Sequence, residues 1–121
     1  LLEGLHYVKK RGITRIMGHE QGLVRRLAAG LERIDGIRIF YDESDSAQAG
    51  VLSFQVMDKD CEQVGEWLSA RKIAVRAGLH CAPYAHRSAG TLEAGTVRVS
   101  FSAFNTEREV DEFLRIMKKL R

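Results

Sequence analysis

Residues 96–101 read Thr-Val-Arg-Val-Ser-Phe, and this stretch indicates the fold. Its odd-numbered positions are apolar and its even-numbered positions are polar, as in a strand that buries one face. Residues 51–56, Val-Leu-Ser-Phe-Gln-Val, alternate in the same way, with the large apolar side chains at the even positions. Both stretches therefore predict strands that pack one face on a core and carry polar groups on the other.

Shorter strands and several helices are predicted around these two strands. Short apolar stretches at residues 37–40 and 73–76 predict further strands, and the polar stretch 42–50 predicts a loop. Apolar residues at helical spacing predict helices at residues 1–11, at 14–34, from Asp58 or Asp60 to about 72, and from Thr106 to about 120. This order predicts a small α+β domain with helices packed on one face of a mostly antiparallel sheet.

Capping side chains mark several of the predicted helix starts. Thr14 is predicted as the N-cap of the longest helix, and Asp58 or Asp60 as the N-cap of the next one. Thr106 and Glu109 have the spacing of a capping box, in which each side chain satisfies the backbone N–H of the other residue.

Length and composition fit one soluble globular domain. The chain has 121 residues, of which 45% are hydrophobic and 29% are charged, enough for a single core. No apolar run is long enough to cross a membrane and no secretory signal is present, so we expect a cytoplasmic location and no membrane partner. The net charge of +3 is only mildly basic and no nucleic-acid motif is visible, so no nucleic-acid partner is expected. Because the chain lacks an initiator Met, we expect a piece of a longer protein.

Two arginines are predicted to point away from the core. Arg98 lies between apolar positions of the strand 96–101, and Arg76 follows the apolar positions of the strand 73–76. Such side chains are either solvated or directed at an anion. Their closeness to the connection 78–95 favours an anion, and a planar guanidinium suits the bidentate binding of a carboxylate.

The two cysteines have different settings. Cys61 shares a helical stripe with Val64 and Leu68, which predicts a small buried hydrophobic side chain. Two cysteines are too few for a disulfide framework, so Cys61 and Cys81 are both expected to be free thiols.

Cys81 is the candidate nucleophile. It lies in the connection 78–95, next to His80 and near Arg76, just before a short helix predicted for residues 83–88. A thiol near a helix N-terminus and cationic groups favours the reactive thiolate form. A metal site built from His80, Cys81 and His86 is the alternative, but the spacing matches no common zinc pattern, so no metal is expected.

The stretch 73–106, IAVRAGLHCAPYAHRSAGTLEAGTVRVSFSAFNT, resembles the C-terminal part of the cysteine desulfurases, which belong to the class V aminotransferases. The matching pattern is V-R-x-G-x-H-C, which ends at Cys81, followed by x-R-x-S and F-N-T, which end at Thr106. The resemblance implies the C-terminal domain of a fold-type I transferase that depends on pyridoxal phosphate (PLP). Residues 1–121 would form this single small domain.

The same resemblance implies that the large PLP-binding domain is absent from this chain. In the family, PLP is held through a lysine in an S-x-H-K segment, and no lysine here has such surroundings. We therefore expect no cofactor-binding residue in this chain, and we expect the chain alone to be inactive. The large domain of the parent chain, a homodimer mate and a sulfur-acceptor protein are the partners that the resemblance implies.

The resemblance also implies roles for the candidate residues. The family converts L-cysteine to L-alanine and carries the sulfur as a persulfide, which would form on Cys81. Arg98 would hold the substrate carboxylate, and Arg76 and His80 would line the same site. A selenocysteine lyase or another class V enzyme is one alternative. A free-standing thiol or metal-binding module that uses Cys81 is another.

Overall fold

The computed structural model describes residues 1–42, 44 and 48–120. Within them the chain forms, in order, α1 (Leu2–Arg11), α2 (Ile13–Leu31), β1 (Ile37–Phe40), β2 (Val51–Val56), α3 (Cys61–Ser69), β3 (Arg76–Gly78), α4 (Pro83–Ala89), β4 (Thr96–Ser100) and α5 (Glu107–Leu120). The loop predicted for residues 42–50 lies partly outside the described residues. Its described part, residues 42, 44 and 48–50, is neither helix nor strand.

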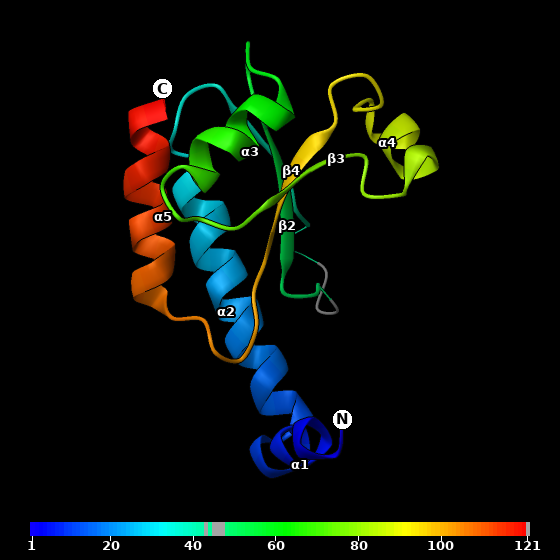
Figure 1. The fold of residues 1–121 in the computed structure, drawn as a ribbon, viewed down its shortest axis with the longest axis vertical. Coiled ribbons are helices and arrows are strands. Elements are labelled where there is room, and N and C mark those ends of the chain that lie inside the picture. The colour runs from blue at the N-terminus through cyan, green and yellow to red at the C-terminus, as the bar shows by residue number, and fades with distance from the viewer. Residues whose placement is uncertain (43, 45–47, 121) are drawn as a thin grey trace.

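The sheet has the strand order β1-β2-β4-β3, and every neighbouring pair is antiparallel. Helices α2, α3 and α5 lie on one side of the sheet, whereas α4 lies on the other side (Figure 1). The predicted α+β class, with helices on one face of an antiparallel sheet, is therefore confirmed.

The core lies between the sheet and these three helices. The alternation predicted for β2 is observed, because Leu52, Phe54 and Val56 are buried while the residues between them are half-buried. Phe54 from the sheet meets Phe113 from α5 edge to face, with ring centroids 6.2 Å apart. In β4, Val97 and Val99 are buried on the same side. The opposite face of the sheet is thus left for other groups.

Two of the predicted caps are present and one is not. The Asp60 carboxylate accepts the Glu62 N–H at 2.7 Å and so caps α3. The Glu109 carboxylate accepts the Thr106 N–H at 2.8 Å, which completes the capping box. Thr14 is not a cap, because α2 already begins at Ile13 after Gly12.

The predicted bounds were wrong at several element ends. Helix α2 ends at Leu31 and α3 at Ser69, each three residues earlier than predicted, and β4 ends one residue early at Ser100. Strand β3 is Arg76–Gly78 rather than 73–76. The reason lies at the end of α3, where the Ile73 N–H still donates to the Leu68 carbonyl at 3.1 Å. The chain therefore joins the β4 ladder only at Arg76.

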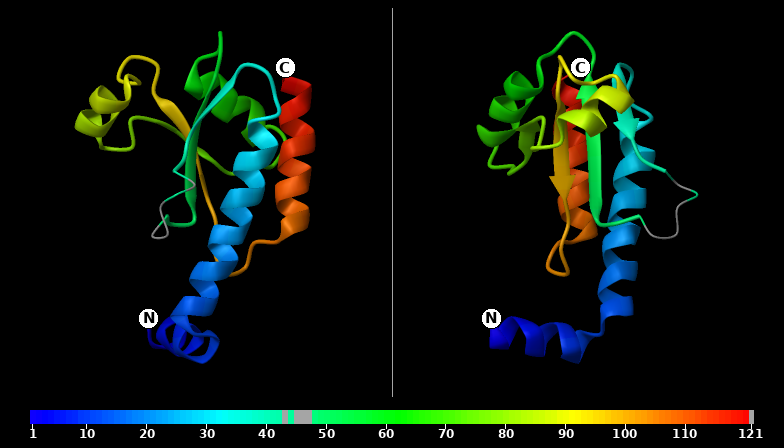
Figure 2. Two further views of the ribbon diagram at one scale, coloured as in Figure 1. Left: turned by 180° about the vertical axis from the view of Figure 1, so that it is seen from behind. Right: turned by 90° about the vertical axis from the view of Figure 1, so that its right-hand side faces the viewer.

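Helix α1 projects away from the sheet (Figure 2) and buries none of its residues. Its apolar side chains Leu2 and Leu5 are 64% and 58% exposed, and Ile13 at the start of α2 is 72% exposed. The Tyr7 ring stacks on Phe104 with centroids 5.0 Å apart. This end of the domain therefore presents an uncovered apolar surface. Within the described chain, no helix combines the length and apolarity that crossing a membrane requires.

Candidate functional site

Arg76 and Arg98 are directly opposite each other in the β3–β4 ladder. On the other side of Arg98, the facing residue in β2 is Ser53. The neighbours of Arg98 along its strand, Val97 and Val99, are buried in the core, so Arg98 points to the face that α2, α3 and α5 leave open. Like charges placed opposite each other destabilise a sheet unless an anion lies between them.

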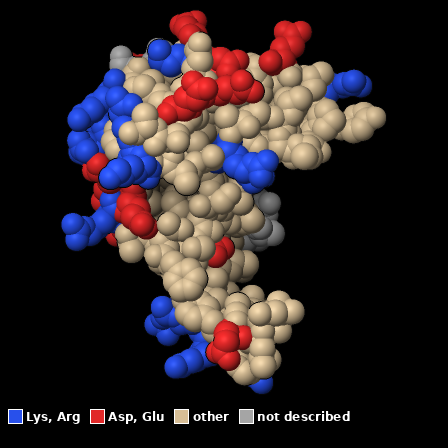
Figure 3. Space-filling model, in the orientation of Figure 1, with Lys and Arg blue, Asp and Glu red and all other residues tan. Residues whose placement is uncertain are grey.

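The Arg98 side chain has an unmet hydrogen-bonding group. Its Nε is buried and has no partner among the described residues. Two other arginines of the described chain do meet carboxylates: Arg26 pairs with Asp111 at 2.8 Å, and Arg115 pairs with Glu112. In Figure 3 basic side chains gather along the side formed by α5, with acidic ones among them. No described carboxylate makes an ion pair with Arg76 or Arg98, so the pair is free to bind an anion from outside.

His80 stands beside these arginines as a neutral imidazole. Its Nε2 lies 3.2 Å from the Thr96 carbonyl oxygen and 3.3 Å from the Thr96 hydroxyl oxygen. Its Nδ1 is buried without a hydrogen-bond partner among the described residues. Burial lowers the pKa of His80, and the positive charge of Arg98 lowers it further, with smaller contributions from His86 and Arg76. At neutral pH His80 is therefore an uncharged imidazole with an unpartnered Nδ1.

Cys81 lies in an exposed turn just before α4, as predicted. His80 and Cys81 both have left-handed backbone conformations, with φ of 53° and 60°. For residues with a β-carbon, each such conformation costs on the order of 1–3 kcal/mol. The Ala82 N–H donates to the Leu79 carbonyl at 2.9 Å and closes the turn. Strain of this kind persists only where the surroundings hold it, and it is typical of functional segments.

Cys61 is buried, as predicted, with 8% of its surface exposed. Burial raises the pKa of its thiol, and the nearby Asp60 carboxylate raises it further. This thiol is protonated at neutral pH and packs as an apolar group. The two cysteines thus differ in the structure as the sequence indicates.

Sequence reasoning missed the polar contacts that hold the connection in place. His86 is buried, and its Nδ1 lies 2.8 Å from the Thr91 hydroxyl. The His86 ring also faces the His80 ring, with centroids 5.8 Å apart. No spacing rule predicts these pairs, although Gly90, with its left-handed φ of 68°, marks the turn that brings Thr91 back to His86. Among the residues that the structure describes, no group of three His, Cys, Asp or Glu side chains could hold a metal ion.

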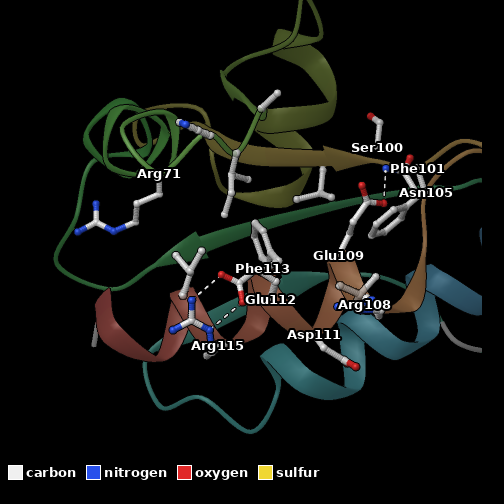
Figure 4. A pocket seen from close by; sticks show the side chains of 16 residues that line it. Arg71, Ser100, Phe101, Asn105, Arg108, Glu109, Asp111, Glu112, Phe113 and Arg115 are labelled. Carbon is white, nitrogen blue, oxygen red and sulfur yellow. Dashed lines mark hydrogen bonds and ion pairs between the residues drawn. The ribbon is translucent and has the colours of Figure 1, made fainter.

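A groove of about 850 Å³ lies elsewhere, on the helix side of the sheet between α5 and residues 71–74 (Figure 4). The polar side chains along it are engaged with one another, as Figure 4 shows for Arg115 and Glu112. Asp111 likewise pairs with Arg26. None of the four candidate residues lines this groove, so it is separate from the candidate site.

Together these features define a small α+β domain with two unpaired arginines on the open face of an antiparallel sheet and an exposed thiol in the turn that follows β3. The family profile described as aminotransferase class-V matches residues 1–113. The chain belongs to the class V aminotransferase family.

Proteins named as cysteine desulfurases are similar to nearly all of the chain. The "Probable cysteine desulfurase" of Mycolicibacterium paratuberculosis is 42% identical over 99% of the chain, and that of Pyrococcus abyssi is 36% identical over 99%. The solved apo structure of the cysteine desulfurase from Thermococcus onnurineus NA1 matches 97% of the chain with a TM-score of 0.90 and 34% identity. The chain covers 28% of that protein, and 17% and 29% of the two sequence relatives.

Membership in this family implies PLP as the cofactor of the parent protein. The residues present here do not fit the attachment of that cofactor. All six lysines, namely Lys9, Lys10, Lys59, Lys72, Lys118 and Lys119, are exposed and lie in helix ends or turns. None of them lies in β3 or β4, the strands that carry Arg76 and Arg98. The unpaired guanidinium groups fit a carboxylate instead.

Proposed function

We propose that this chain is the small domain of a PLP-dependent cysteine desulfurase. The observation that carries the proposal is the Arg76–Arg98 pair, with its buried and unpartnered Arg98 Nε, beside the exposed turn of Cys81. This arrangement supplies an anion-binding site and, three residues after β3, an accessible thiol. The similarity to proteins named as cysteine desulfurases supports the same substrate, L-cysteine.

Arg98 binds the carboxylate of the substrate in this proposal. A charge-assisted hydrogen bond of this kind contributes about 1.5–3 kcal/mol, because the guanidinium is already partly desolvated and meets an ionised partner. Arg76, directly opposite, adds positive charge on the other side of the bound carboxylate. The bound carboxylate attracts both guanidinium groups and so offsets the repulsion between them.

His80 lines the same site as a hydrogen-bond acceptor. With the Nε2–H donated to the Thr96 carbonyl, the Nδ1 lone pair is available to a ligand. A neutral imidazole next to two arginines does not compete for the carboxylate. Instead, its Nδ1 accepts a hydrogen bond from a donor group of the substrate. This contact favours an amino acid that carries a donor at that position.

Cys81 accepts the sulfur atom of the substrate in this proposal. Its thiolate attacks the sulfur of L-cysteine and forms an S–S bond, while the carbon–sulfur bond of the substrate breaks. The electron pair of the broken bond remains with carbon, which takes up a proton as L-alanine forms. The enzyme is left as a persulfide on Cys81, so the atoms balance without an added oxidant or reductant. The exposed turn allows the persulfide to reach an acceptor.

The remaining parts of this function lie outside the chain. PLP, which supplies an electron sink to the substrate when bound, would be held by a large domain of the parent protein. The exposed apolar residues of α1 support a surface that packs against another part of that protein. We further propose a homodimeric, cytoplasmic parent enzyme and a separate sulfur-acceptor protein.

The test is the mass of the intact parent protein after incubation with L-cysteine. A mass gain of one sulfur atom, reversed by a thiol reductant, is expected for the native protein and for Cys61→Ser. The Cys81→Ser protein should gain no sulfur. A native protein that releases no alanine and gains no sulfur would refute the proposed function, and sulfur retained by Cys81→Ser would refute the assignment of the nucleophile.

A further inference from the structure

The part of the chain that holds Cys81 has few contacts with the rest of the domain. Within the described residues, no other helix or strand packs against α4, which stands apart from the sheet (Figure 1). Most of the α4 side chains, including Tyr84 at 78% exposure, point to solvent. The strained turn at His80 and Cys81 therefore needs another source of support.

A small network of polar side chains supports the turn at His80 and Cys81. The buried polar side chains of the described chain are His86, Thr91 and Thr96, and all of them lie in or next to this connection. With His80 they form what we call the histidine–threonine network. His80 contacts Thr96 at 3.2 Å and faces His86, and His86 contacts Thr91 at 2.8 Å. The His86–Thr91 contact is buried and hydrogen-bonded, and a paired buried contact of this kind rigidifies the segment that carries it.

Thr91 is the residue that closes the network. Its hydroxyl oxygen lies 2.8 Å from His86 Nδ1 and 3.4 Å from the His86 carbonyl oxygen, so the hydroxyl contacts both the ring and the backbone of His86. Its backbone N–H donates to the same carbonyl at 2.8 Å, and its carbonyl accepts the Gly95 N–H at 2.8 Å. Thr91 thus ties the end of α4 to the start of β4. The His86 ring is held where it meets His80, the residue next to the nucleophile.

We propose that His86 and Thr91 are positioning residues, which act through the His80 ring to hold the turn that presents the Cys81 thiol to the substrate. The proposal rests on the proposed function for the identity of the substrate. It does not require either residue to touch the substrate. Replacing His86 or Thr91 should slow the sulfur transfer and leave the carboxylate contact of Arg98 intact.

Thr91→Val and Thr91→Ser in the full-length parent enzyme form the matched pair for the test. Valine keeps the shape and removes the hydroxyl, whereas serine keeps the hydroxyl. We expect Thr91→Val to slow persulfide formation on the order of tenfold or more, as a misplaced reacting group does, with the KM for L-cysteine changed by less than about twofold. Thr91→Ser should stay within about twofold of the native rate, as should Ser88→Ala, a control on the exposed side of α4.

A second readout needs no substrate. Without the network the turn is free to leave its left-handed conformation, so the rate at which iodoacetamide labels the exposed Cys81 should differ by about threefold or more between Thr91→Val and Thr91→Ser. His86→Phe, which keeps a ring but lacks Nδ1, should act like Thr91→Val, and the double variant should be no worse than either single one. Equal labelling and equal sulfur transfer in the valine and serine variants would overturn the proposal. If the native enzyme forms no persulfide, the proposed function fails, and the labelling rates alone decide the positioning role.

Discussion

The Cys61 sulfur and the Gly95 backbone lie so close together that a β-carbon on Gly95 would be 2.8 Å from Cys61 Sγ. The same β-carbon would be 3.2 Å from the Gly78 carbonyl oxygen. Helix α3 therefore packs directly on the chain where it enters β4, at the strand that carries Arg98. The buried thiol has a packing role at this contact, in contrast to the exposed thiol of Cys81.

Replacing Gly95 with alanine should destabilise the protein through both strain and overlap. Gly95 has a left-handed φ of 62°, and its neighbours leave no space for a methyl group. We expect a loss of about 1–3 kcal/mol in the free energy of unfolding, measured by urea denaturation. Gly90→Ala is the control, because Gly90 has a similar φ of 68° but open space around it. Equal losses in the two variants would show that the Cys61 contact contributes nothing.

Alkylation should separate the two thiols. Cys81 is exposed, whereas Cys61 is buried and its pKa is raised by burial and by Asp60. We expect iodoacetamide to modify Cys81 first in the native parent protein, with Cys61 modified only when the protein unfolds. Peptide mapping by mass spectrometry after a short exposure provides the measurement. Faster labelling of Cys61 would contradict both the burial and the choice of nucleophile.

Arg98→Ala should weaken substrate use without releasing the cofactor. Loss of the carboxylate contact should raise the KM for L-cysteine and lower kcat/KM by roughly ten- to a hundredfold. Arg98→Lys should recover only part of the loss, because an ammonium cannot reproduce the planar fork. Steady-state alanine production and the PLP content of each variant are the measurements. Native kinetics in Arg98→Ala would remove this residue from the site.

The charge of Arg98 should also be visible in the titration of His80. Burial and Arg98 lower the pKa of His80 in the folded protein. As the pH falls through about 6.5, the unfolded chain binds a proton at this residue that the folded chain does not. His80 therefore lowers stability as the pH falls through this range and down to its folded pKa. In Arg98→Ala the His80 pKa should move upward in NMR titrations, and no movement would mean that the two side chains do not interact.

The features that the sequence predicted correctly depend on local patterns. The strand period at residues 96–101 sets the orientation of Arg98 whatever its partner strands are, and the Thr106–Glu109 capping box is contained within one turn. The start of β3 could not be predicted, because it depends on how the end of α3 releases the chain toward β4. The contacts of His86 and Thr91 were missed for a similar reason, since they arise from tertiary burial of a connection that has no periodic pattern.

The 121-residue chain should fold by itself and yet show no activity. A continuous core joins the sheet to α2, α3 and α5, and its largest members, including Phe54 and Leu27, are fully buried. Such a core meets the requirement for a compact domain, so cooperative unfolding is expected. Activity is not expected because no lysine of the chain lies in an S-x-H-K segment, and without PLP the carbon–sulfur bond of L-cysteine is not activated. Cys81 would remain reactive toward iodoacetamide but would have no activated sulfur to attack.

Two measurements test whether the isolated chain is active: PLP binding followed by visible absorbance, and sulfide release from L-cysteine in the presence of a thiol reductant. Stoichiometric PLP binding with turnover would show that these residues suffice for the reaction, and a non-cooperative unfolding transition would show that the core needs the rest of the parent protein.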